Sequence, residues 1–144
     1  MLNQNLLDKK IQLFSCYIDE LDPLVNGFSV EEIKNDHLKY RSIERLFQLA
    51  VDVMIDINVH ILKEENFGAP DDLQSTFKVL GDSKVLDRVF AYKIAPLVGS
   101  RNMIVHRYEK LDMNMFLNNL KNNFSDFKRY IIDINIFFKT KKKM

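Results

Sequence analysis

The 144-residue sequence is poor in the residues that interrupt or cross-link a chain. It contains four glycines, three prolines and one cysteine, Cys16, so an internal disulfide is excluded. No apolar run reaches the roughly 20 residues that a bilayer span needs, and residues 1–5 lack the basic and apolar blocks of a secretory signal. We therefore expect a protein of the reducing cytoplasm that contacts no membrane and folds as a single domain over residues 1–144.

An excess of charge of one sign is also missing. The chain has 21 Lys and Arg against 20 Asp and Glu, which leaves a formal net charge of +1. A protein that coats a nucleic-acid duplex needs a strongly positive surface, so any nucleic-acid contact here has to use a local basic site. The basic end, residues 139–144, is expected to be a frayed tail without a function.

What the sequence does contain is helical periodicity, and no strand pattern competes with it. An apolar stripe predicts a first helix over residues 7–22. Ser29 and Glu32 match a capping box, in which the hydroxyl and the carboxylate satisfy the first free amides of the next helix. That helix is predicted over residues 29–63, with an irregularity near residues 35–36.

The second half of the chain predicts shorter helices followed by a long one. Residues 73–80 form a short helix closed by Gly81, and residues 84–94 form the next. Pro96 then kinks this helix or starts a new segment, because it lacks an amide donor. Apolar residues over 113–138 keep a three-and-four step, which is typical of core or dimer packing and not of a cofactor pocket.

The candidate site is the segment 101–108, which carries Arg101, Asn102, His106 and Tyr108. An arginine that never deprotonates beside an imidazole that titrates near neutrality suits chemistry on phosphodiesters. On a regular helix Asn102 and His106 share a face, but Arg101 and His106 are separated by about 140°. Convergence of this pair requires a bent Arg side chain, a helix that ends near His106, or a second copy of the segment across a twofold axis.

Gly99 stands just before this segment. A glycine inside a helix costs about 1 kcal/mol relative to alanine. We therefore expect a close backbone approach at Gly99 by another helix or by a ligand.

A polar stripe on the second helix has two interpretations. Its members recur three or four residues apart: Arg41, Arg45, Gln48, Asp52, Asp56 and His60. The stripe is either a solvated or internally satisfied face, or Asp52, Asp56 or His60 supports a site on a facing helix.

No metal or cofactor site is expected. His37, His60 and His106 are scattered, no Cys or carboxylate cluster has ligand spacing around them, and no glycine-rich phosphate loop is present. A ribonuclease can work without either, because the RNA 2′-hydroxyl is an internal nucleophile. His106 would act as general base or acid, and Arg101 would stabilise the charge on the phosphorane.

The motif Arg101-Asn102-x-x-x-His106-x-Tyr108 resembles the R-x4-H-x-Y motif of the HepT-like toxins in the HEPN superfamily. Segments 45–48 and 56–60 also resemble the corresponding helix of that family, and the likeness covers most of the chain. These toxins are usually encoded beside MntA-type nucleotidyltransferase antitoxins.

The resemblance implies an all-α, antiparallel bundle of four to five helices that forms a symmetric homodimer with the motif segments facing each other. It implies a metal-independent endoribonuclease that cleaves cellular RNA, with Arg101 and His106 as the catalytic pair and Asn102 in support. It also implies that a cognate MntA-like nucleotidyltransferase transfers AMP to Tyr108, which would add negative charge and bulk at the cleft. The alternative is a non-catalytic helical subunit that docks a nucleotidyltransferase.

Overall fold

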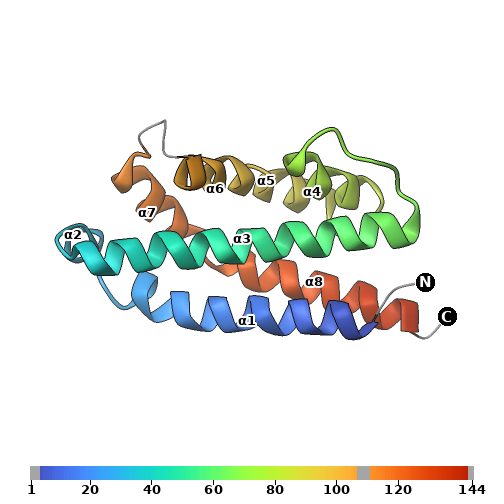
Figure 1. The fold of residues 1–144 in the computed structure, drawn as a ribbon, viewed down its shortest axis with the longest axis horizontal. Helices are drawn as coiled ribbons and strands as arrows, with labels where there is room; N and C mark the ends of the chain where they lie inside the picture. Colours follow the sequence, from blue (N-terminus) through green and yellow to red (C-terminus); the bar gives the residue numbers. More distant parts are fainter. Residues whose placement is uncertain (1–3, 107–110, 143–144) are drawn as a thin grey trace.

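The structure, a computed structural model that describes residues 4–106 and 111–142, is built of α-helices (Figure 1). No strand occurs among these residues, so the predicted all-α class is confirmed. Within the same ranges, no helix is long and apolar enough to cross a membrane. The helices are α1 (Gln4–Asn26), α2 (Val30–Lys34), α3 (His37–Glu65), α4 (Leu73–Asp82), α5 (Arg88–Ile94), α6 (Leu97–His106), α7 (Met113–Asn122) and α8 (Ser125–Lys142).

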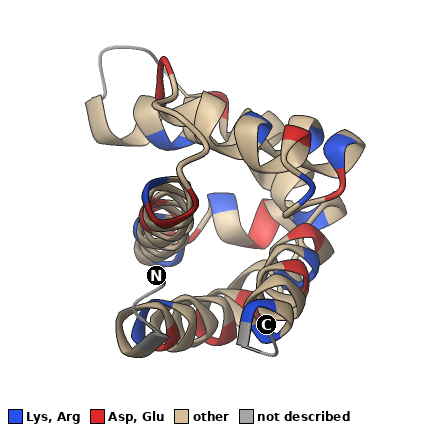
Figure 2. Ribbon diagram, turned by 90° about the vertical axis from the view of Figure 1, so that its right-hand side faces the viewer, with Lys and Arg blue, Asp and Glu red and all other residues tan. Residues whose placement is uncertain are grey.

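The helices form four antiparallel rods (Figure 1). α1 and α3 are single rods, the row α4–α6 is a third, and α7 with α8 is the fourth. α3 lies at the centre and packs against α1, α4 and α6. α3 also contacts α8, because the ring centroids of Phe47 on α3 and Phe127 on α8 lie 6.3 Å apart. Seen from the end, Lys and Arg are interspersed with Asp and Glu over these rods (Figure 2), as the small net charge suggests.

The first half of the chain follows the predicted order, with one boundary misplaced. The capping box is confirmed, because Ser29 Oγ accepts from the Glu32 amide at 3.1 Å and Glu32 Oε1 accepts from the Ser29 amide at 3.0 Å. The irregularity at residues 35–36 is a complete break between α2 and α3. The predicted end of the first helix near residue 22 is wrong, since α1 continues through Pro23 and the Gly27 amide still bonds to the Pro23 carbonyl at 3.0 Å.

Three boundaries in the second half were also misplaced. The predicted closure of the short helix at Gly81 is wrong, since α4 contains Gly81 and ends at Asp82. α5 begins at Arg88 and not at residue 84, because Lys84 has a left-handed backbone with φ of 66° and Asp87 Oδ2 caps the Phe90 amide at 3.1 Å. The predicted helix over 113–138 is divided into α7 and α8 around Asn123. Its apolar positions nevertheless enter the core, as predicted: Phe116, Leu120, Phe127, Ile134 and Phe138 are buried.

The close backbone approach occurs at Gly81 and not at Gly99. A Cβ on Gly81, inside α4, would lie 2.6 Å from the Cβ of Ala91 on α5. A Cβ on Gly99 would meet nothing closer than Gln74 Nε2, at 3.8 Å. Glycine therefore lets α4 and α5 pack closely, whereas a Cβ at Gly99 would only reach ordinary contact distance from Gln74.

A buried polar network fixes α3 against its neighbours. The Tyr130 hydroxyl lies 2.6 Å from Oδ1 of Asn58 and 3.1 Å from the Met54 carbonyl, and Asn58 Nδ2 donates to Thr76 Oγ1 at 3.1 Å. Burial raises the pKa of Tyr130 well above its usual value. Because a buried polar group without a partner is costly, this network selects one register of α3 against α4 and α8.

The described part of the basic carboxyl-terminal segment is helical. α8 continues to Lys142, and Lys141 Nζ lies 2.9 Å from Oε2 of Glu65. Residues 139–142 thus belong to a helix where the sequence suggested a frayed tail.

Candidate functional site

The described part of the motif segment, residues 101–106, lies on α6, which starts as a new helix directly after Pro96. Val98 and Ile104 are buried and attach α6 to the core. Arg101 and Asn102 are half-buried, whereas His106 is exposed at the end of the helix. The sequence left two predictions open for Pro96, a kink within one helix or the start of a new segment. The structure shows the start of a new segment.

Arg101 is held by two oxygen acceptors. Its Nε donates to Oδ1 of Asp52 on α3 at 2.6 Å, and its Nη1 donates to Oδ1 of Asn102 at 2.8 Å. The Arg101 and Asp52 side chains are 22% and 31% exposed, so the ion pair is partly shielded from water. Because a guanidinium carries five donors in a fixed plane, these two bonds orient Arg101 and leave donors that can meet a phosphate.

The structure divides the polar stripe of α3 into separate roles. Asp52 faces α6 and meets Arg101, as the second interpretation of the stripe required. Asp56 instead pairs with Lys10 on α1, at 3.5 Å and 60% exposed. His60 lies one turn further along α3, and its Nε2 is buried without a hydrogen-bond partner among the described residues. The structure therefore brings Asp52 to the motif, whereas Asp56 faces α1.

His106 and Arg101 point from different sides of α6. The helix runs unbroken from Leu97 to His106, which keeps the two residues about 140° apart around its axis. Arg101 is directed toward α3 by Asp52. Asn102 lies one turn before His106 on a shared face. Tyr108 lies outside the described residues, so its predicted role stays a prediction.

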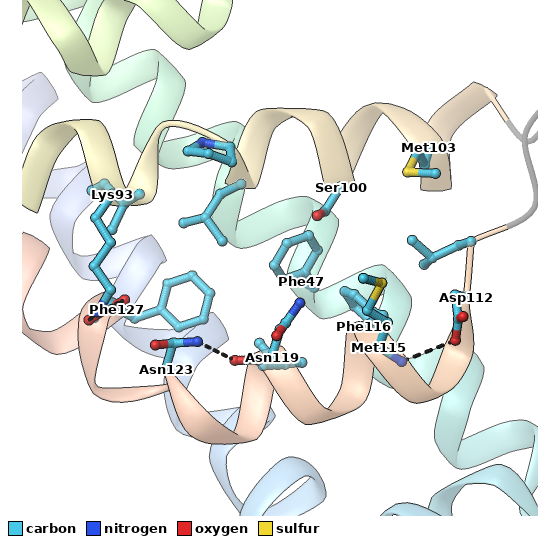
Figure 3. A pocket seen from close by; sticks show the side chains of 16 residues that line it. Phe47, Lys93, Ser100, Met103, Asp112, Met115, Phe116, Asn119, Asn123 and Phe127 are labelled. Atoms are coloured by element: carbon cyan, nitrogen blue, oxygen red, sulfur yellow. Dashed lines mark hydrogen bonds and ion pairs between the residues drawn. The ribbon is translucent and has the colours of Figure 1, made fainter.

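Two cavities border α6, on different faces. The larger, of about 500 Å³, lies on the face of Leu97, Ser100 and Met103, between α6 and α7. Figure 3 shows its apolar floor, with Phe47, Phe116 and Phe127, and its amide rim at Asn119 and Asn123. Neither Arg101 nor His106 lines this cavity, so its size does not make it the catalytic site.

The smaller cavity is on the face that carries Asn102. It measures about 450 Å³ and is lined by Asp72, Leu73, Gln74, Val98, Gly99 and Asn102. Sequence reasoning missed the α4 residues, because nothing in their own pattern indicates that they pack beside the motif. The unusual glycine at position 99 was the available signal.

Side chains that commonly bind metals are dispersed in the described part of the chain. No group of three or more His, Cys, Asp and Glu side chains is arranged there to hold an ion. The polar motif residues that the structure describes are Arg101, Asn102 and His106.

Comparison with known proteins identifies the family. Residues 14–134 match the family Ribonuclease HepT-like. The chain belongs to this family. The resemblance seen in the motif, to HepT-like toxins of the HEPN superfamily, is confirmed.

Two relatives have similar sequences. The tRNA nuclease HepT of Aphanizomenon flos-aquae is 29% identical over 135 residues, which cover 94% of this chain and 91% of that protein. The mRNA nuclease HepT of Shewanella oneidensis is 24% identical over 100 residues, which cover 69% of this chain and 75% of that protein.

Solved structures show the same fold. A tri-AMPylated HEPN toxin of Shewanella oneidensis, in complex with an MNT antitoxin, aligns with a TM-score of 0.83 at 22% identity over 94% of this chain and 99% of that one. YutE of Bacillus subtilis, a cytosolic protein of unknown function, aligns with a TM-score of 0.84 at 14% identity over 97% of this chain and 93% of that one. At these identities the structures establish the fold alone.

Asp52→Ala is predicted to release Arg101 without unfolding the protein. The Arg101 Nε–H should exchange faster with solvent in NMR spectra, because its acceptor is gone. The free energy of unfolding should change by less than about 1 kcal/mol, since the pair is partly exposed. Asp56→Ala, one turn along the same helix, is the control and should leave the Arg101 signal unchanged. An unaltered Nε–H signal in Asp52→Ala would contradict the assigned contact.

Proposed function

We propose that this protein is the toxin of a toxin–antitoxin pair and a metal-independent endoribonuclease whose active site forms between two copies of the chain. The observation that carries the proposal is the arginine of α6 held by Asp52 at 2.6 Å, on the same helix as Asn102 and His106. The names of the two relatives, a tRNA nuclease and an mRNA nuclease, support RNA as the substrate.

The proposed reaction uses the RNA 2′-hydroxyl as nucleophile. Its oxygen attacks the adjacent phosphorus, a His106 imidazole accepts the hydroxyl proton, and the P–O5′ bond breaks while a second imidazolium protonates the leaving oxygen. The products are a 2′,3′-cyclic phosphate and a 5′-hydroxyl end. Arg101 stabilises the additional negative charge of the phosphorane. These groups supply the base, the acid and the positive charge, so the reaction needs no metal ion.

Helix geometry supports a site made by two copies of the chain. Within one subunit, Arg101 and His106 lie about 140° apart on α6, and Asp52 directs Arg101 toward α3. A twofold axis beside α6 would place two Arg101 and two His106 side chains around one cleft. Such a cleft is locally cationic although the chain has a net charge of only +1.

Control by an antitoxin completes the proposal. The solved toxin whose fold this chain shares is AMPylated and bound to an MNT antitoxin. We infer that an MntA-like nucleotidyltransferase binds this chain and transfers AMP to Tyr108, two residues after His106. The added phosphate and nucleoside would repel RNA phosphates and fill the entrance of the cleft.

His106→Ala and Arg101→Ala are each predicted to remove RNA cleavage. Loss of a general acid–base group lowers rates by about 10²–10⁴-fold, and loss of a charge-stabilising donor by about 10²–10³-fold. Wild-type cleavage should persist in excess EDTA. His37→Ala and Arg88→Ala, at exposed positions on α3 and α5, are matched controls that should retain activity.

Full activity of His106→Ala would refute the catalytic assignment. A folded wild-type protein that cleaves no RNA but binds a nucleotidyltransferase would establish the alternative, a non-catalytic docking subunit.

Tyr108 is predicted to carry the modification when the protein is co-expressed with its nucleotidyltransferase. Each adenylyl group adds one AMP to the intact mass, and peptide fragmentation should place it on Tyr108. Tyr108→Phe should stay unmodified, while Tyr92→Phe, on α5, should be modified like wild type. AMP found on another residue, or on none, would exclude the proposed control.

A further inference from the structure

The cavity of about 450 Å³ beside Asn102 has the position of a substrate pocket, and we name it the Gln74 pocket. It is lined by Asp72, Leu73, Gln74, Val98, Gly99 and Asn102. The volume lies within the range of about 300–1,000 Å³ that small-ligand sites occupy.

The pocket opens on the face of α6 that carries the motif histidine. Gly99, Asn102 and His106 are spaced by three and four residues, so they follow one face of the helix. His106 lies about 6 Å beyond Asn102 along the axis, at 1.5 Å per residue. A nucleotide whose phosphate reaches His106 can therefore extend its base toward the pocket.

Gly99 keeps this part of α6 open. A Cβ at this position would already stand 3.8 Å from Gln74 Nε2, so a larger side chain would occupy the space between the two helices. Glycine exposes the α6 backbone instead, and a flat ring can approach it closely.

Gln74 stands on a rigid turn. Asp72 caps α4 by accepting from the Ser75 amide at 2.8 Å, and Thr76 Oγ1 donates to the Leu73 carbonyl at 2.7 Å. Thr76 is in turn bonded to Asn58 in the core, at 3.1 Å. The first turn of α4 is thereby fixed relative to α3, which also carries Asp52.

The chemistry of the pocket matches a purine with an amino group. A glutamine amide has a donor and an acceptor side by side, the pattern that pairs with N7 and the N6 amino group of adenine. Leu73 is 40% exposed and offers an apolar surface for the ring. The Asp72 carboxylate adds negative charge that favours an amino group over the carbonyl that uracil presents at the equivalent edge.

We propose that the Gln74 pocket binds the adenine base of a nucleotide next to the scissile phosphate, and that Gln74 sets this preference. The proposal rests on the RNA-cleaving function proposed above. It adds a base specificity and names a residue that determines it. Single-stranded RNA is commonly read in this way, through the edges of unstacked bases.

The test is a base-preference measurement with Gln74→Leu, which removes the amide and keeps the approximate size. Oligonucleotides differ only in the base on one side of the cleavage site, and each side is varied separately. Wild type should cleave the adenine substrate about tenfold faster than the uracil one, as expected for one bidentate contact. In Gln74→Leu this ratio should fall to near one. Gln12→Leu, on the exposed face of α1, is the control and should keep the wild-type ratio.

A binding measurement separates failure of this inference from failure of the proposed function. In NMR titrations, adenosine 5′-monophosphate should shift the Gln74 side-chain and Gly99 backbone signals, uridine 5′-monophosphate should shift them less, and Gln74→Leu should remove the difference. Adenine binding without any RNA cleavage would refute the nuclease and retain the pocket. RNA cleavage with a base ratio that Gln74→Leu does not change would overturn the assignment of Gln74, as would titrations in which no pocket signal moves.

Discussion

The contact between Arg101 and Asp52 is the interaction on which the site depends. An arginine side chain has several rotatable bonds, and holding its head costs entropy. The hydrogen bonds of Arg101 to Asp52, at 2.6 Å, and to Asn102, at 2.8 Å, offset this entropy loss in the folded state, before any substrate binds. A guanidinium oriented in advance can stabilise a transition state without reorganising.

That contact requires α3 to hold one register, which the core enforces. The Tyr130–Asn58–Thr76 network ties α3 to α8 and α4 through buried hydrogen bonds. The same helix therefore sets the position of Asp52 toward α6 and, through Thr76, the position of the first turn of α4. Arg101, the proposed catalytic arginine, and Gln74, the proposed base-reading glutamine, are therefore both positioned by α3. This common support would fix the distance between the cleaved phosphate and the bound base.

Periodicity, caps and the motif predicted much of this structure. The capping box at Ser29 and the apolar steps along each rod are local patterns, and local patterns decide helices. Pro23 was misread because a proline near a helix end removes one donor without stopping the helix. Gly81 and Gly99 were misjudged, and Gln74 was missed, because their roles depend on which helix lies opposite. Local patterns in a single sequence do not show which helices pack against each other.

The proposed active site requires two copies of the chain, since one α6 holds Arg101 and His106 on different sides. Mixed dimers of one wild-type and one His106→Ala subunit test this directly. The shared cleft needs one His106 as base and the other as acid, so the mixed dimer should cleave RNA about 10²–10⁴-fold more slowly than wild type. A mixed dimer that forms, as native mass spectrometry would verify, and keeps half of the wild-type activity would contradict a shared cleft.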